Sequence, residues 1–258
     1  LAKNLGVKKI YKVGGAQAIA ALAFGTETIP KVAKITGPGN IYVALAKKLL
    51  SGIVGIDSIA GPSEVVILSD DSVNPEWVAA DLCAQAEHGG DNETVLISNS
   101  KSHIENVIKS IEIISNKLNR KDLIISSINN KSFAVYYKNL DDAFEIINKI
   151  APEHIEILAE IDLKLILNKI QNSGAIFYGK FTPVATGDYF SGPNHIIPTN
   201  STAIFSSSLG VYDFVKRISF CSLTKEYINK YGDKIINMAN FENLDAHSFS
   251  IKIRNENI

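Results

Sequence analysis

Three short segments of the chain combine side chains that metal or acid–base chemistry needs. The first is Ala84-Gln85-Ala86-Glu87-His88-Gly89, in which Gln85 and His88 are three positions apart. On a helix this spacing puts an amide oxygen and an imidazole on one face, where both can reach the same divalent ion. The alternative is that Gln85 caps a polar helix end and His88 is an ordinary surface histidine. Cys83 falls on the other side of such a helix, and we expect it to be buried and unreactive.

The second segment, Ala151-Pro152-Glu153-His154, places a carboxylate beside an imidazole. The proline ends the preceding helix, so we expect the pair in the turn that leads into a strand. Glu153 and His154 can divide acid–base work, because one can prepare a water while the other takes the proton of an alcohol. The alternative is a turn with two solvated polar residues.

The third segment runs from Gly187 to His195 and contains Asp188 among glycines that permit unusual backbone geometry. Asp188 offers an anionic oxygen to a divalent ion, although ordinary surface loops often have this composition.

Weaker signals lie at turns. Gly37-Pro38-Gly39-Asn40 stands where a strand meets a helix and could cradle a dinucleotide phosphate, but it lacks the full glycine fingerprint. Gln17 follows Gly14-Gly15 at a similar turn. Ser63 and Glu64 stand at the head of a strand, where a turn or cap role is the alternative.

The sequence around two further histidines indicates no function for them. His103 lies on what should be a solvated helix face, and His247 lies in the tail and reads by itself as a surface residue.

The elements that must position these groups alternate between strands and helices, which predicts an α/β fold. The predicted strands cover residues 9–13, 32–35, 65–68, 94–97, 123–125, 155–158 and 175–178. The predicted helices cover residues 16–24, 41–50, 102–118, 141–150 and 163–171, with one more from Asn74-Pro75 to His88. After Gly210 we expect a helical tail. Ala60-Gly61-Pro62 is a plausible junction between two α/β units.

Composition narrows the class of protein. The chain has 258 residues, of which 46% are hydrophobic and 21% charged, as in a soluble globular protein with a real core. A net charge of −1 argues against nucleic-acid binding. The longest apolar run, around Ala18 to Phe24, is too short to cross a bilayer, and the opening residues lack the pattern of a secretory leader, so we expect no secretion. Two cysteines make no disulfide framework, so we expect a cytoplasmic protein.

Taken together, the order and spacing of these motifs resemble the L-histidinol dehydrogenase family over essentially the whole chain. The segments that carry the resemblance are Gly14 to Leu22, Gly37 to Asn40, Ile56-Asp57 through Ala60-Gly61-Pro62-Ser63-Glu64, Asp81 to Gly89, Pro152-Glu153-His154, Gly187 to His195, Ser206 to Gly210 and Ala246-His247.

The resemblance implies a site and a reaction. It implies one zinc per subunit with ligands Gln85, His88, Asp188 and His247, the last supplied in trans by the partner in a homodimer. It implies that L-histidinol contacts Ser63, Gln85, His88, His154, Asp188, Glu242 and His247. Glu153 and His154 would be the acid–base pair, and Gln17 and Asn40 would contact NAD. The implied reaction oxidises L-histidinol through L-histidinaldehyde to L-histidine, the last steps of histidine biosynthesis, and reduces two NAD.

The resemblance also implies an architecture of two incomplete Rossmann-like domains and a small helical dimerisation segment. Residues 1–62 would be the C-terminal portion of the NAD-binding domain, 63–208 the second domain with most zinc and substrate residues, and 209–258 the helical tail. Because the chain opens at Leu1 and the family has a substantial preceding segment, we expect this chain alone to be poorly stable and inactive. Two other functions remain open: a zinc hydrolase, in which Glu153 and His154 activate water beside a metal, and a non-catalytic remnant.

Overall fold

The computed structural model describes residues 1–256. The chain forms two compact units, Leu1–Phe214 and Val215–Ile258. The first is an α/β unit and the second a pair of helices, as the alternating pattern and the tail composition predict.

The first unit is built on a sheet of five parallel strands. These are β3 (Glu64–Ser69), β4 (Glu93–Ser98), β5 (Ser132–Tyr136), β6 (His154–Ile157) and β7 (Ala175–Tyr178), and their spatial order is β5-β4-β3-β6-β7. β3, the first of these five strands in the sequence, therefore lies at the centre of the sheet. The later strands are added on both sides of it.

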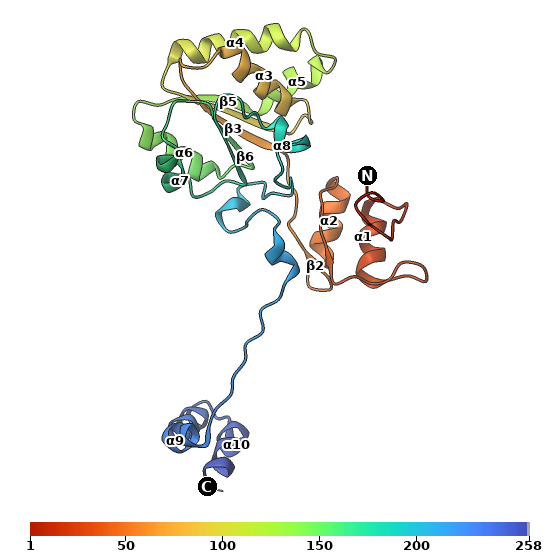
Figure 1. Ribbon diagram of the computed structural model, residues 1–258, viewed down its shortest axis with the longest axis vertical. Coiled ribbons are helices and arrows are strands. Elements are labelled where there is room, and N and C mark those ends of the chain that lie inside the picture. The colour runs from red at the N-terminus through yellow and green to blue at the C-terminus, as the bar shows by residue number, and fades with distance from the viewer. Residues whose placement is uncertain (257–258) are drawn as a thin grey trace. The chain divides into compact units, whose positions relative to one another are not determined.

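Helices cover both faces of this sheet (Figure 1). One face carries α3 (Pro75–Ala86), α4 (Lys101–Ser115) and α5 (Lys121–Lys131), and the other carries α6 (Leu140–Ile150) and α7 (Leu163–Lys169). Because both faces are covered, all six residues of β3 are buried, which explains its continuous apolar run.

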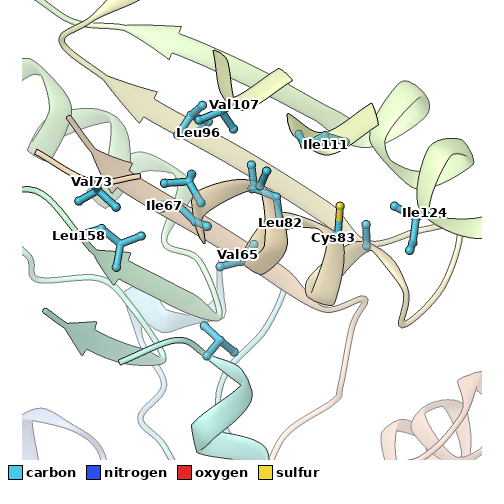
Figure 2. Packing of buried hydrophobic residues seen from close by; sticks show 14 of the residues in the cluster. Val65, Ile67, Val73, Leu82, Cys83, Leu96, Val107, Ile111, Ile124 and Leu158 are labelled. Atoms are coloured by element: carbon cyan, nitrogen blue, oxygen red, sulfur yellow. The ribbon is translucent and has the colours of Figure 1, made fainter. Parts of the chain in front are cut away.

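The core lies in two layers that alternate along the strands. On one face Ile67 of β3 belongs to the same cluster as Leu82 of α3 and Val107 of α4, as Figure 2 shows. On the other face Leu68 packs with Ile147 of α6. Each fully buried aliphatic side chain of this size contributes about 1.5–3 kcal/mol to the free energy of folding. This rigid sheet holds the polar residues that follow or precede its strands.

A smaller α/β element precedes the large sheet. Helix α1 (Gly15–Phe24) and helix α2 (Ile41–Leu50) pack against two short parallel strands, β1 (Lys34–Ile35) and β2 (Gly55–Ile56). After β7 come the five-residue α8 (Ala185–Tyr189) and the 3-10 turns η1 (Thr202–Ile204) and η2 (Val211–Phe214). The second unit consists of α9 (Lys225–Phe241) and α10 (Asp245–Glu256), which pack on each other.

Two of the predicted strands are wrong. Residues 9–13 are exposed and irregular, because no other described segment pairs with them. Residues 123–125 lie inside α5, where Ile124 and Ser127 are buried on one side of the helix. The sequence pattern also missed β5, an edge strand that follows polar residues directly.

The helix predicted to reach His88 stops at Ala86, so His88 stands in the turn that follows. Among residues 1–256, no helix is long and apolar enough to span a membrane.

Candidate functional site

The predicted metal-binding and acid–base residues of the first unit, together with Ser63, gather at the amino ends of β3 and β6. Ser63 precedes β3, Glu153 precedes β6, and His154 begins β6 opposite Val65. Open parallel sheets usually bind ligands beyond the carboxyl ends of their strands, so this site occupies the less common edge.

His154 is held as a neutral base. Its side chain is buried, and its Nδ1 lies 3.1 Å from the backbone oxygen of Glu64. A carbonyl oxygen only accepts hydrogen bonds, so Nδ1 carries the ring proton and Nε2 keeps a lone pair. Burial, and then the charge of His195, lowers the pKa of His154 to about 4. The imidazole is therefore uncharged and able to accept a proton at neutral pH.

Glu153 lies beside this imidazole, and its pKa is shifted in the opposite direction. It is 6% exposed, and its Oε2 accepts a hydrogen bond from the backbone N–H of Glu64 at 3.1 Å. Burial raises the pKa of Glu153 to about 8, against the hydrogen bond from Glu64 and together with the charge of Glu64. Although Oε2 lies 3.5 Å from Nδ1 of His154, both groups are neutral between the two pKa values. The pair is thus not an ion pair, and the alternative interpretation of two solvated residues in a turn is wrong, because both side chains are buried.

Three predicted metal ligands line one small cavity of about 90 Å³: Gln85, His88 and Asp188. Gln85 is 5% exposed in the last turn of α3, and His88 follows in a turn closed by a 3.3 Å bond from its N–H to the Gln85 carbonyl oxygen. The expected placement of both on one helix face is therefore wrong, but the turn keeps both against the same cavity.

The donors around this cavity fit a divalent ion. The side-chain Nε2 of Gln85 is buried without a hydrogen-bond partner, and a half-turn of the amide would present its oxygen there instead. Amide oxygen, imidazole nitrogen and carboxylate oxygen are all accepted by zinc. His88 and Asp188 also line a second cavity of about 260 Å³, which Ser63, Glu153 and His195 share. A ligand in the larger cavity would therefore contact two predicted metal ligands, His88 and Asp188, together with Glu153.

His195 is a site residue to which the sequence interpretation assigned no role. Its Nε2 lies 3.2 Å from Nε2 of His154 and 3.3 Å from Oδ1 of Asp188. It thus connects the predicted base, His154, to one predicted metal ligand, Asp188. Glu153, His154 and His195 also bring one ligand atom each within 4.8 Å of one another. Since Nδ1 of His154 is bound to a carbonyl, this second set offers only Nε2 from that ring. The only sequence signal for His195 is its position at the end of the glycine-containing segment.

Two carboxyl groups, those of Glu156 and Asp81, connect the elements that carry the site residues. Oε1 of Glu156 in β6 accepts a 2.5 Å hydrogen bond from the N–H of Val184, at the start of α8. The carboxyl of Asp81, one turn before Gln85 on α3, faces Glu156. Burial raises the pKa of both carboxyls, to about 6 for Asp81 and about 8 for Glu156, which favours a protonated carboxyl in the pair at neutral pH. The pair links three elements that carry Gln85, His154 and Asp188.

The predicted NAD residues lie around the small sheet. Asn40 caps α2, since its side chain accepts hydrogen bonds from the N–H groups of Tyr42 and Val43 at 3.1 and 3.2 Å. Gln17 is exposed near the start of α1. The turn that precedes α2 faces the larger cavity, which Gly37, Pro38 and Gly39 line. A side chain at Gly39 would meet Val43 at 2.5 Å, so the close approach needs glycine there.

A buried ion pair holds this turn in place. The Lys47 ammonium binds the Asp57 carboxylate and donates to the Gly37 carbonyl oxygen at 3.0 Å. Asp57 in turn accepts from the Gly37 N–H at 2.7 Å. The turn is therefore fixed by side chains from α2 and from the segment after β2.

Two predicted residues lie in the second unit. Glu242 ends α9 and His247 lies on α10, and both are exposed. Their contribution to the site stays a prediction.

The structure also corrects the interpretation of His103. Its side chain is buried, and its Nε2 lies 3.0 Å from Oγ of Ser69 at the carboxyl end of β3. The helix face predicted to be solvated packs on the sheet instead. His103 is part of the core at the edge opposite the candidate site.

Comparison with known proteins gives one consistent family. The family model described as histidinol dehydrogenase matches residues 1–255. The histidinol dehydrogenase of Clostridium acetobutylicum is 49% identical over 249 residues, which cover 96% of this chain and 58% of the relative. That of Halalkalibacterium halodurans is 49% identical over 255 residues, which cover 99% and 60%. The crystal structure of histidinol dehydrogenase from Elizabethkingia anophelis superposes with a TM-score of 0.90 at 38% identity, and the match covers 99% of this chain and 59% of that one. The chain thus spans somewhat under two thirds of the length of the relatives it matches.

Proposed function

The chain belongs to the histidinol dehydrogenase family, and on that premise we propose that the protein oxidises L-histidinol through L-histidinaldehyde to L-histidine. NAD would accept a hydride in each of the two oxidations. The observation that carries the proposal is the hydrogen bond from Nδ1 of His154 to the backbone oxygen of Glu64, because it leaves a neutral Nε2 lone pair next to His195, which lines the larger cavity.

The first oxidation needs a base for the alcohol proton. Nε2 of His154 would take this proton while the hydride leaves the carbinol carbon. The low pKa of His154 keeps the ring uncharged before the step. His195, 3.2 Å away, would then share the proton through its own Nε2.

The second oxidation needs a water on the aldehyde carbon. Glu153 would take a proton from that water as the new carbon–oxygen bond forms, and the second hydride would then leave the hydrate. A carboxylate with a pKa near 8 is a stronger base than an ordinary one, although a smaller fraction of it is ionised at neutral pH.

Gln85, His88 and Asp188 would hold a zinc ion, and we propose that His247 of a second subunit completes the set in a homodimer. Bound there, the ion would orient L-histidinol through the imidazole and the amine of that substrate. The buried Nε2 of Gln85, which has no hydrogen-bond partner, supports this assignment, because the flipped amide would turn its oxygen to the ion in place of an unsatisfied donor. Ser63 and Glu242 are proposed substrate contacts, and Gln17 and Asn40 proposed NAD contacts.

The test is the amount of NADH formed from L-histidinol by the protein expressed from its full coding sequence. We expect two NADH per histidinol, lost on chelation and restored by zinc. Gln85→Leu should lose the metal while it keeps the fold, measured by metal content and thermal melting. No NADH from a folded, zinc-loaded dimer would contradict the proposal and favour a hydrolase or a non-catalytic protein.

A further inference from the structure

Glu64 contacts both members of the acid–base pair with separate groups. Its backbone N–H donates to Oε2 of Glu153 at 3.1 Å, and its backbone oxygen accepts from Nδ1 of His154 at 3.1 Å. Its carboxylate accepts from the N–H of Glu153 at 3.3 Å through Oε2 and from the N–H of Asn200 at 3.0 Å through Oε1. Glu64 and Glu153 therefore bind each other reciprocally, each side chain to the other's backbone.

Because Glu64 is buried, the hydrogen bonds of its carboxylate must offset the cost of removing that group from water. Its side chain is 9% exposed at the first position of the central strand, where an apolar residue would satisfy the sheet equally well. Burial raises its pKa, and the hydrogen bonds from Glu153 and Asn200 act against that rise. A buried carboxyl beside a second one is retained only if its hydrogen bonds repay the desolvation.

The contacts also define what depends on the side chain. The bond to His154 comes from the Glu64 backbone, so it persists with any residue that keeps β3 in place. The bond to the Glu153 N–H comes from the carboxylate, and without it a buried donor loses its acceptor. Loss of the carboxylate should therefore disturb Glu153 much more than His154.

We propose that Glu64 is a positioning residue that fixes Glu153 through its carboxylate and the tautomer of His154 through its backbone oxygen. This inference rests on the proposed function for its effect on activity, but not for its effect on the backbone of Glu153. Under the proposed division of labour, changing the Glu64 side chain impairs the aldehyde step and spares the alcohol step.

The experiment compares Glu64→Gln, Glu153→Gln and the double variant in the full-length protein. Glutamine keeps the shape of Glu64 but has a single acceptor oxygen for two N–H donors. We expect Glu64→Gln to slow the aldehyde step by about 10- to 100-fold with the KM for NAD unchanged. NADH per histidinol should fall from two toward one, with aldehyde captured by a carbonyl reagent. If Glu64 acts through Glu153, adding Glu64→Gln to Glu153→Gln should change the rate by less than about twofold.

The matched control is Glu93→Gln on β4, opposite Glu64 in the sheet register, which removes a charge that adds to the raised pKa of Glu64 but leaves the hydrogen bonds of the Glu64 carboxylate in place. It should leave both steps unchanged. Equal slowing of both steps by Glu64→Gln, or multiplicative losses in the double variant, would reduce Glu64 to a purely structural residue and overturn the proposal.

Hydrogen exchange of the Glu153 amide separates this inference from the proposed function. Glu64→Gln should speed exchange over residues 151–158, and Glu93→Gln should not. If wild-type protein forms no NADH from histidinol, the proposed function fails, yet the exchange result still decides the role of Glu64. If Glu64→Gln does not fold, Glu64→Asp keeps both acceptor oxygens but withdraws them by one methylene, and the same loss of protection is expected. Unchanged protection in a folded variant contradicts the proposal.

Discussion

Gly174, just before β7, lies against the backbone of Glu153, so Gly174→Ala should move the proposed water base. A Cβ at this position would lie 2.5 Å from the Glu153 carbonyl oxygen, whereas ordinary contact begins at 3.4 Å. The carbonyl must therefore retreat by the difference, about 0.9 Å. It cannot move freely, because it accepts a 2.9 Å hydrogen bond from the N–H of Ala175. The other side is closed as well, since the Cβ would lie 3.1 Å from the Pro198 carbonyl oxygen.

The expected cost has two parts. Overpacking of this kind destabilises a protein by about 1–3 kcal/mol. A misplacement near 1 Å of a reacting group costs about 100-fold in rate. We therefore expect the aldehyde step to slow about 100-fold, so that NADH per histidinol falls from two toward one, while the protein stays folded with a modestly lower melting temperature.

The assay is the rate of aldehyde oxidation with saturating NAD and the NADH formed per histidinol, beside a thermal melt of the same preparation. The control is Gly232→Ala in α9, where a Cβ meets only ordinary contacts at 3.4 Å and beyond. It should keep full activity and equal or slightly higher stability. A Gly174→Ala protein with a wild-type rate of aldehyde oxidation and a wild-type melting temperature would refute the reasoning, since the backbone of Glu153 would then tolerate the displacement.

Three further predictions concern charge and hydrogen bonding. Lys47→Met leaves Asp57 buried without its cation and should lower the free energy of unfolding by about 3–5 kcal/mol, measured by urea denaturation. Ser69→Ala removes the partner of buried His103 and should destabilise the fold by about 1–3 kcal/mol without a change in kcat, because it lies at the opposite sheet edge from the candidate site. Because burial raises the pKa of Glu153 from 4.5 to about 8, the folded state loses stability relative to the unfolded state as pH rises through that window. Glu153→Gln should therefore gain stability relative to wild type between pH 5 and pH 8, measured as a growing difference in melting temperature.

Each of these predictions has a clear contrary result. If Asp57→Asn fails to restore stability to Lys47→Met, the buried charge is not the cause of the loss. A fall in kcat for Ser69→Ala at unchanged substrate affinity would mean that the two sheet edges are coupled. A melting-temperature difference for Glu153→Gln that stays constant with pH would show that Glu153 is not protonated in the folded state.

Much of the fold follows from local signals. The helix boundaries at Asn40 and Asn74 agree with the structure, because each asparagine caps its helix with hydrogen bonds to residues only two or three positions away. A strand has no such local bond, so residues 9–13 fit the pattern but find no partner among the described strands. The short apolar run at 123–125 suits a strand and a buried helix face equally well, and packing decided for the helix.

By itself the sequence determined the residue types of the site and their order: Gln85 near His88, Glu153 beside His154, and Asp188 in a glycine-containing segment. Such information is local, because side-chain chemistry and chain spacing do not depend on the fold. Only the tertiary structure decided that His154 is a neutral base with its lone pair on Nε2, and that Glu153 has a raised pKa. Both properties come from burial and from Glu64, which lies 89 and 90 positions away along the chain. Desolvation and long-range hydrogen bonds exist only once β3 and β6 lie side by side.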